Sequence, residues 1–194
     1  MIARWLACGG MVALLGWPLL LAAKELPVNT RLGGDFQLQS TVAAQDQLSD
    51  FKGRLVLLNF GYTSCPDVCP MVLSRMTQVM NALEEDSKET RARVQPLFVT
   101  FDPARDTVER LQAYLRHFGK DFIGMTGTPE QVADVAKRFG VVYLPQKSDS
   151  AAGTLFAHSD YIYLLDDQGR VRALFGSKEP IDEIVDAVES LLDE

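Results

Sequence analysis

The chain has 194 residues, of which 47 % are apolar and 23 % are charged, so its composition is that of a globular protein rather than a disordered or collagen-like chain. Its 19 basic and 26 acidic residues give a formal net charge of −7. A chain with this excess of negative charge has no long-range attraction for phosphates, which argues against a nucleic-acid partner. Three cysteines are too few for a disulfide-based scaffold.

Residues 1–23 have the layout of a secretory leader. Arg4 is followed by an uncharged, mostly apolar run from Trp5 to Ala23 that ends in small residues. Because about 20 residues are needed to cross a bilayer as a helix, the run is also long enough for a membrane anchor. The sequence therefore predicts a signal peptide or an N-terminal membrane anchor, and leaves the choice open. Both place residues 24–194 outside the cytoplasmic membrane, on the periplasmic side.

The rest of the chain, residues 24–194, alternates strand patterns with helix patterns and contains no repeats. Two nearly continuous apolar runs, 54–60 and 94–101, predict central strands buried on both faces. Alternating residues at 35–42 predict an edge strand. Further strands are expected at 122–125, 161–165 and 171–175, the last two forming a hairpin.

Apolar stripes at helical spacing predict four helices. The first follows a loop at 61–70 and ends in the charged stretch 84–93. The second is expected to begin at Asp106 as N-cap, with Glu109 three residues on, and to run to about Phe118. The third begins at Thr128-Pro129, with Gln131 in the capping-box position, and ends at Gly140; a loop at 147–153 and a closing helix over 181–192 follow. This order predicts a single α/β domain, with a mixed sheet and helices on both faces.

Cys65 and Cys69 lie in the segment CPDVCP between a predicted strand and a predicted helix, where α/β folds commonly place their chemistry. Because a proline follows each cysteine, both are expected outside regular helix, with Pro70 at the first helical position. The two sulfurs then meet at the positive end of the helix dipole, which favours thiolate and lowers the pKa of each. Such a pair can form a structural disulfide, exchange disulfides with a partner or bind a soft metal.

His158, in the segment FAHSD just before a predicted strand, is one of only two histidines. With Cys65 and Cys69 it can complete a site of two sulfurs and one nitrogen, which suits copper(I); structural zinc would need a fourth ligand. The other reading is an ordinary hydrogen-bonded surface histidine. His117, near the end of a predicted helix, is expected to be structural. Three methionines are also candidate thioether ligands: Met76 and Met80 are expected in the core, whereas Met71 lies next to the cysteine segment.

Four segments together closely resemble the Sco/SenC family of copper chaperones for cytochrome c oxidase. They are NFGYTSCPDVCP at 59–70, VTFDPARDT at 99–107, FIGMTGTPEQ at 122–131 and AHSDYIYLLDDQGR at 157–170. The cysteine motif and the later His-Ser are highly specific when they occur together. The resemblance covers most of residues 30–193, and one departure is Ala157, where many members carry Asp.

The resemblance implies a thioredoxin-like fold, an N-terminal membrane tether and one copper per chain, as Cu(I) or Cu(II), held by Cys65, Cys69 and His158. It also implies delivery of copper to the CuA subunit of cytochrome c oxidase, after a thioredoxin-type reductant has reduced the two cysteines; other copper carriers are further expected partners. Asp102 and Asp106 match the family's acidic element. They are expected either to form a strand-to-helix turn with a cap, or to make an acidic contact near the metal, outside the ligand set, or with the partner.

Two other functions use the same residues. A thiol–disulfide oxidoreductase would reduce a partner's cysteines, but thioredoxin-type enzymes use a C-x-x-C pair with a facing proline, and here the spacing is C-x-x-x-C. A copper or redox sensor would bind copper without transferring it. A peroxiredoxin-like peroxidase is disfavoured, because Tyr62 stands where its Thr-x-x-Cys signature requires threonine.

Overall fold

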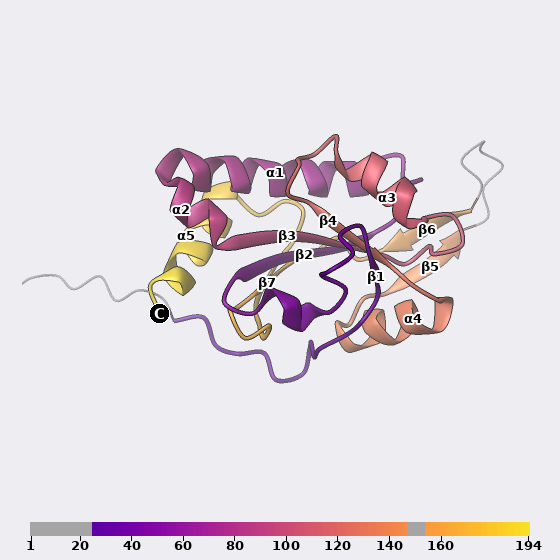
Figure 1. Cartoon of the computed structure of the whole chain (residues 1–194), viewed down its shortest axis with the longest axis horizontal. Coiled ribbons are helices and arrows are strands. Elements are labelled where there is room, and N and C mark those ends of the chain that lie inside the picture. Colours follow the sequence, from indigo (N-terminus) through magenta and orange to yellow (C-terminus); the bar gives the residue numbers. More distant parts are fainter. Residues whose placement is uncertain (1–24, 147–153) are drawn as a thin grey trace, which may run out of the picture.

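The computed structural model describes residues 25–146 and 154–194, so the predicted leader at 1–23 and the predicted loop at 147–153 lie outside the described residues. The described chain forms one six-stranded sheet with the order β1-β4-β3-β2-β7-β8 (Figure 1). Strands β2, β3 and β4 are parallel, whereas β1, β7 and β8 pair antiparallel with their neighbours, so the predicted mixed sheet is confirmed. The bounds are β1 Gln39–Ser40, β2 Leu55–Gly61, β3 Val94–Thr100, β4 Ile123–Thr126, β7 Ile162–Leu165 and β8 Val171–Phe175.

The two central strands, β2 and β3, are buried along their whole length. Their near-continuous apolar sequences match this position, because a strand covered on both faces has no solvent-facing side. The predicted runs 54–60 and 94–101 are therefore confirmed to within one residue at each end. β1 is shorter than the predicted strand at 35–42, but it lies at the edge of the sheet as expected.

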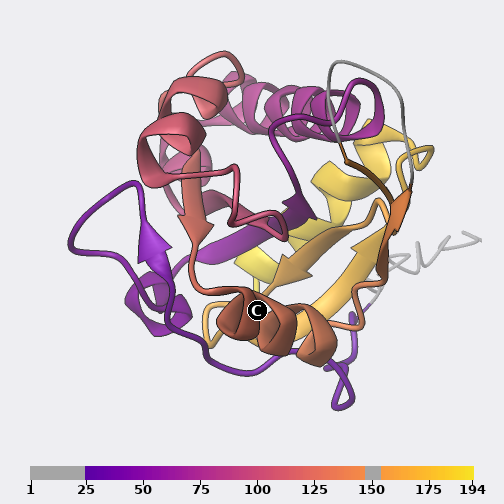
Figure 2. The ribbon, with the colours of Figure 1, turned by 90° about the vertical axis from the view of Figure 1, so that its right-hand side faces the viewer.

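Helices cover both faces of the sheet, as predicted. One core cluster contains the apolar stripes of α1, α3 and α5, and the other contains that of α4 and a short 3-10 turn at Leu48–Phe51. Viewed from its end, the sheet separates α4 from α1 (Figure 2). The bounds are α1 Val68–Asp86, α2 Lys88–Ala92, α3 Val108–Leu115, α4 Pro129–Arg138 and α5 Ile181–Leu192. Within the described residues, no helix is both long and apolar enough to cross a bilayer.

The observed N-caps of α4 and α3 agree with the prediction for the first helix and differ from it for the second. At α4 the prediction is confirmed: Thr128 and Gln131 form the capping box, and Gly140 turns the chain with φ +68° after the helix. At α3 it is wrong, because Thr107 and not Asp106 is the N-cap. The Asp106 carboxylate is instead fully buried and bonded to Thr63 and Thr100. Because the Asp106 carboxylate accepts hydrogen bonds from Thr63 and Thr100, it does not cap the first turn of α3.

A second, two-stranded sheet was not predicted. Strands β5 (Tyr143–Gln146) and β6 (Leu155–His158) pair antiparallel, with Tyr143 opposite His158. Both strands are short, and the first contains Pro145, which is unfavourable within a strand; neither carries the alternation that marks a half-buried strand. This hairpin matters for function because it carries His158.

Candidate metal centre

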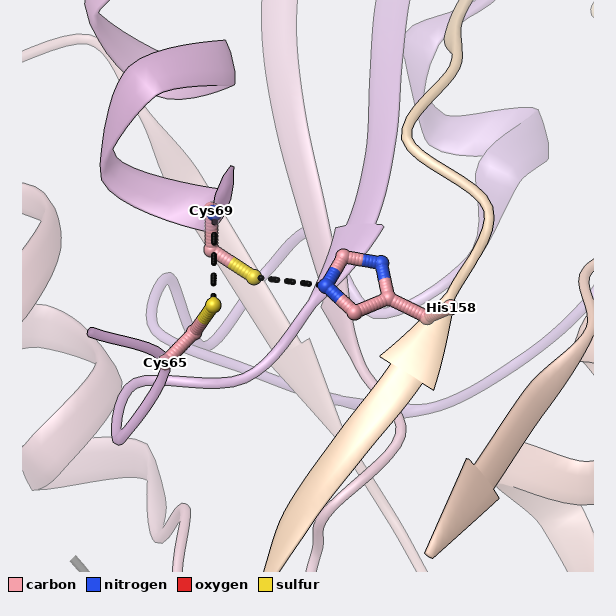
Figure 3. Close-up of side chains that lie close together, drawn as sticks. All are labelled: Cys65, Cys69 and His158. Carbon is pink, nitrogen blue, oxygen red and sulfur yellow. Dashed lines mark hydrogen bonds between the residues drawn. The ribbon is translucent and has the colours of Figure 1, made fainter. Parts of the chain in front are cut away.

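The loop between β2 and α1 places Cys65 and Cys69 next to each other. Cys65 is half-buried and Cys69 is buried, with 1 % of its surface exposed; both are free thiols. The backbone N–H of Cys69 points at the Cys65 sulfur, with an N···Sγ distance of 3.4 Å (Figure 3). An N–H of the first helical turn has no acceptor within the helix, so the sulfur of Cys65 occupies a position that stabilises negative charge.

The prediction that both cysteines lie outside regular helix is wrong for Cys69. The helix begins at Val68, so Cys69 and Pro70 are its second and third residues. Proline is tolerated there because the N–H groups of the first turn need no intrahelical partner, and the preference against helix before proline is only a bias. The consequence is that Cys69 sits on a rigid element, whereas Cys65 sits on the loop.

His158 reaches the two sulfurs from the far end of β6 (Figure 3). Its Nε2 atom lies 3.4 Å from the Sγ atom of Cys69, and its Nδ1 atom lies 2.8 Å from the carbonyl oxygen of Ser159. A carbonyl only accepts hydrogen bonds, so Nδ1 carries the proton of the neutral ring and Nε2 presents its lone pair to the sulfurs. The ligand atoms of Cys65, Cys69 and His158 all lie within 4.8 Å of one another.

Aromatic packing fixes the hairpin that carries His158. Tyr143 stacks on Phe101 with centroids 4.8 Å apart and an interplanar angle of 11°, and Phe156 packs edge-on against Tyr62. The Tyr62 hydroxyl also accepts a hydrogen bond of 3.1 Å from the backbone N–H of Phe156. The rings of Tyr62 and Phe101 contact the imidazole as well, so the histidine is held by the same cluster that holds its strand.

The pKa values of the two thiols are shifted in opposite directions. A hydrogen bond from the Cys69 thiol lowers the pKa of Cys65 well below its ordinary range, against the opposing effect of burial. The same hydrogen bond, together with burial, raises the pKa of Cys69. The predicted lowering of the pKa is thus confirmed for Cys65 and wrong for Cys69, because the hydrogen bond that stabilises the Cys65 thiolate requires Cys69 to keep its proton. Burial lowers the pKa of His158, but the hydrogen bonds to Cys65 and the Ser159 carbonyl outweigh it and raise the pKa overall.

Asp106 anchors the loop that precedes Cys65. Its carboxylate accepts hydrogen bonds from the backbone N–H of Thr63 at 2.9 Å and from the hydroxyls of Thr63 and Thr100 at 2.5 and 2.6 Å. Arg110 lies 3.6 Å from the same carboxylate and donates to the hydroxyls of Thr63 and Ser64. Asp106 therefore fixes the loop from outside the candidate ligand set.

Asp102 acts on the hairpin rather than on the cysteine loop. Its carboxylate pairs with Arg105, whose guanidinium lies 5.7 Å from the centroid of the Tyr62 ring. Arg105 also donates a 2.7 Å hydrogen bond to the carbonyl of Thr154, just before β6. Asp102 and Arg105 together connect the β3–α3 turn to the strand that ends at His158.

The other residues considered as ligands lie in the core or at the surface. Met76 and Met80 are buried in the core, and His117 is exposed just after α3. Met71 is exposed near the start of α1. No cis peptide bond occurs in the described parts of the chain, so the facing cis-proline of thioredoxin-type enzymes has no counterpart there.

The asymmetry of the thiols predicts the pH dependence of their alkylation. In the reduced, metal-free protein, we expect Cys65 to react with iodoacetamide at a nearly constant rate as the pH is lowered below about 8.5, where an ordinary cysteine loses its thiolate. Its rate falls only at acidic pH, whereas Cys69 stays unreactive. In Cys69→Ala the hydrogen bond is gone, so the rate profile of Cys65 moves toward higher pH. An unchanged profile in that variant contradicts the assignment of the hydrogen bond.

The α/β sheet, the cysteine pair at the start of α1 and the histidine on the added hairpin define a thioredoxin-like protein with a thiol–imidazole centre suited to a soft metal ion. The family model described as SCO1/SenC matches residues 24–193, and the chain belongs to this family.

Individual relatives agree with this assignment. The SCO2-like protein RC0895 of Rickettsia conorii is 38 % identical over 143 residues, which cover 73 % of this chain and 68 % of that protein. The crystal structure of Arabidopsis thaliana ScoI with copper bound matches with a TM-score of 0.76 and 29 % identity, over 84 % of this chain and 99 % of that one. BsSco, described as having a disulfide switch and as a member of the Sco family of cytochrome c oxidase assembly proteins, matches with a TM-score of 0.66 over 84 % of this chain and 96 % of its own. At 20 % identity BsSco supports the fold alone.

Proposed function

We propose that the reduced protein binds one copper ion through Cys65, Cys69 and His158. The observation that carries the proposal is the convergence of two sulfurs and an imidazole nitrogen within 4.8 Å. Two thiolates and a neutral imidazole give a net charge of −1 around Cu(I) and zero around Cu(II), and these soft and borderline donors suit both ions. The copper-bound structure of the Arabidopsis relative supports the same cargo for this chain.

The function that follows is delivery of copper to the CuA centre of cytochrome c oxidase, as the family relationship suggests. Cys65 is partly exposed and lies on a loop, so an incoming thiolate can replace it first. Buried Cys69 and half-buried His158 would be released afterwards. Because a disulfide offers no thiolate, a thioredoxin-type reductant must reduce the pair before loading. The chain would work on the periplasmic side of the membrane, with residues 1–23 as its leader or anchor.

Copper titration of the reduced protein tests the first part of the proposal. We expect one copper per chain and a thiolate-to-Cu(II) charge-transfer absorption that saturates at one equivalent. Prior oxidation of Cys65 and Cys69 to a disulfide abolishes both signals. A reduced protein that binds no copper, or that binds it equally well as the disulfide, contradicts the assignment.

Transfer is tested separately, by mixing the copper-loaded protein with an apo CuA domain. Under the proposal, copper leaves this chain and the spectrum of the CuA centre develops. Retention of the copper by this chain would favour the sensor function over delivery.

Reduction of a partner's cysteines is a second candidate, and the asymmetry of the thiols favours it. An accessible thiolate at Cys65 beside a buried thiol at Cys69 is the arrangement that attacks a disulfide and then resolves the mixed disulfide. The assay is catalytic reduction of an oxidised CuA domain by copper-free protein in the presence of a thiol reductant. Rapid turnover would support the reductase, whereas stoichiometric reaction without turnover leaves delivery as the function.

A further inference from the structure

The last residue of β2, Gly61, lies directly beneath the Cys69 sulfur. A Cβ atom built at this position would be 2.8 Å from the Sγ atom of Cys69 and 2.8 Å from the Cε2 atom of Phe98. Real Cβ atoms almost never approach another atom so closely. We infer that Gly61 is a positioning residue for the candidate metal centre: its missing side chain provides the space in which the Cys69 sulfur sits.

Backbone conformation does not explain the glycine. Gly61 has no positive φ, unlike Gly140 and Gly169, and it continues a regular strand opposite Thr100 of β3. Any L-residue can adopt that conformation, so the requirement for glycine comes from the space above it. Glycine within a strand commonly marks such a close approach by a neighbouring group.

Of the two neighbours, the Cys69 sulfur can be displaced by rotation about a single side-chain bond. Phe98 is fully buried in the core cluster that contains the apolar stripes of α1, α3 and α5, and its ring contacts Tyr114 of α3. The backbone of Gly61 is held by the strand pairing and by a 3.0 Å hydrogen bond from the Phe101 N–H to its carbonyl. An added methyl group would therefore displace Cys69 Sγ, and with it the 3.4 Å approach to His158. Metal sites tolerate misplacement of only about 0.5 Å.

The inference rests on the proposed copper site, and the chain offers a matched control for it. Gly124 in β4 is also crowded: a Cβ there would lie 2.7 Å from Leu115 Cδ1 and 3.1 Å from Leu111 Cβ, and no sulfur is among its three nearest atoms. Gly61→Ala and Gly124→Ala therefore each add one methyl group at a crowded strand position of the same sheet. Only the first places that methyl group against the candidate ligands.

The experiment measures Cu(II) affinity, by competition with a chelator, and the charge-transfer absorption of the reduced full-length variants. We expect Gly61→Ala to lose about tenfold or more in affinity and to shift or weaken the absorption band, while Gly124→Ala stays within about twofold of the parent. Parental copper binding in Gly61→Ala, or an equal loss in Gly124→Ala, overturns the inference.

Two further measurements keep the test decisive. If Gly61→Ala fails to fold, the double variant Gly61→Ala/Phe98→Leu removes the clash with the ring and leaves the clash with the sulfur. This variant should fold and still bind copper poorly. Full copper binding by it overturns the inference.

If the parent itself binds no copper, the proposed function fails, but the position of the Cys69 sulfur can still be tested through the reactivity of the two thiols. The equilibrium of the Cys65–Cys69 disulfide with glutathione should then change about fivefold or more in Gly61→Ala and less than about twofold in Gly124→Ala. Equal equilibria in the two variants would overturn the inference on its own.

Discussion

Replacing His158 by alanine is expected to lower the Cu(II) affinity of the reduced protein by about 100-fold or more, because loss of a supporting group alone typically costs 10- to 100-fold and His158 is a direct ligand in the proposed site. The imidazole is the only nitrogen donor in the described cluster, and its Nε2 atom already faces the Cys69 sulfur. A chelator competition titration measures the loss. The charge-transfer spectrum should change with it, since the two sulfurs are left without a nitrogen partner.

The matched control for this variant is His117→Ala. His117 is exposed after α3, so its removal should leave copper affinity within about twofold of the parent. Both variants should still form the Cys65–Cys69 disulfide, which shows that the thiols remain intact and adjacent. If His158→Ala binds copper as tightly as His117→Ala does, the histidine is not a ligand.

Replacing Asp106 by asparagine is expected to destabilise the fold by about 3 kcal/mol, because it leaves a buried donor without an acceptor and removes the charge opposite Arg110. The carboxylate is 0 % exposed and accepts three hydrogen bonds, two of them from Thr63. An amide of the same shape presents N–H to one of these donors. Urea unfolding of the reduced, metal-free protein measures the effect, and copper affinity should fall as well, because Thr63 lies in the loop before Cys65.

Asp134→Asn is the control for this second variant. Asp134 pairs with Arg138 at 3.0 Å on the surface of α4, with 65 % of its side chain exposed, so the change should cost no more than about 0.5 kcal/mol. Equal, small effects of the two substitutions would show that Asp106 does not anchor the cysteine loop.

Much of the fold could be predicted from the sequence because local patterns and burial agree. The apolar runs of β2 and β3 and the capped stripe of α4 each have one physical explanation, and the structure confirms them. The β5–β6 hairpin could not be predicted in this way. Its stability comes from rings distant in the sequence, such as Phe101 against Tyr143, and not from a pattern within its strands.

The candidate site likewise has a part that local sequence patterns predict and a part that depends on residues distant in the sequence. The proximity of Cys65 and Cys69 follows from their spacing. His158, 89 residues after Cys69, is a candidate ligand from the sequence, with an ordinary surface histidine as the alternative, and the family resemblance favours the ligand. The sequence predicts Asp106 as an N-cap, because an acidic residue before a helix has the same local pattern whether it caps the helix or turns inward. The role of Gly61 could not be found at all without the position of the sulfur above it.

X-ray absorption spectroscopy at the copper edge, on the reduced protein loaded with one equivalent of copper, tests the central claim most directly. The proposed site predicts a copper ion with two sulfur ligands and one imidazole nitrogen, together with the loss of one sulfur in Cys65→Ser and of the imidazole in His158→Ala. A copper ion coordinated by oxygen and nitrogen alone, or an imidazole signal that persists in His158→Ala, would contradict it.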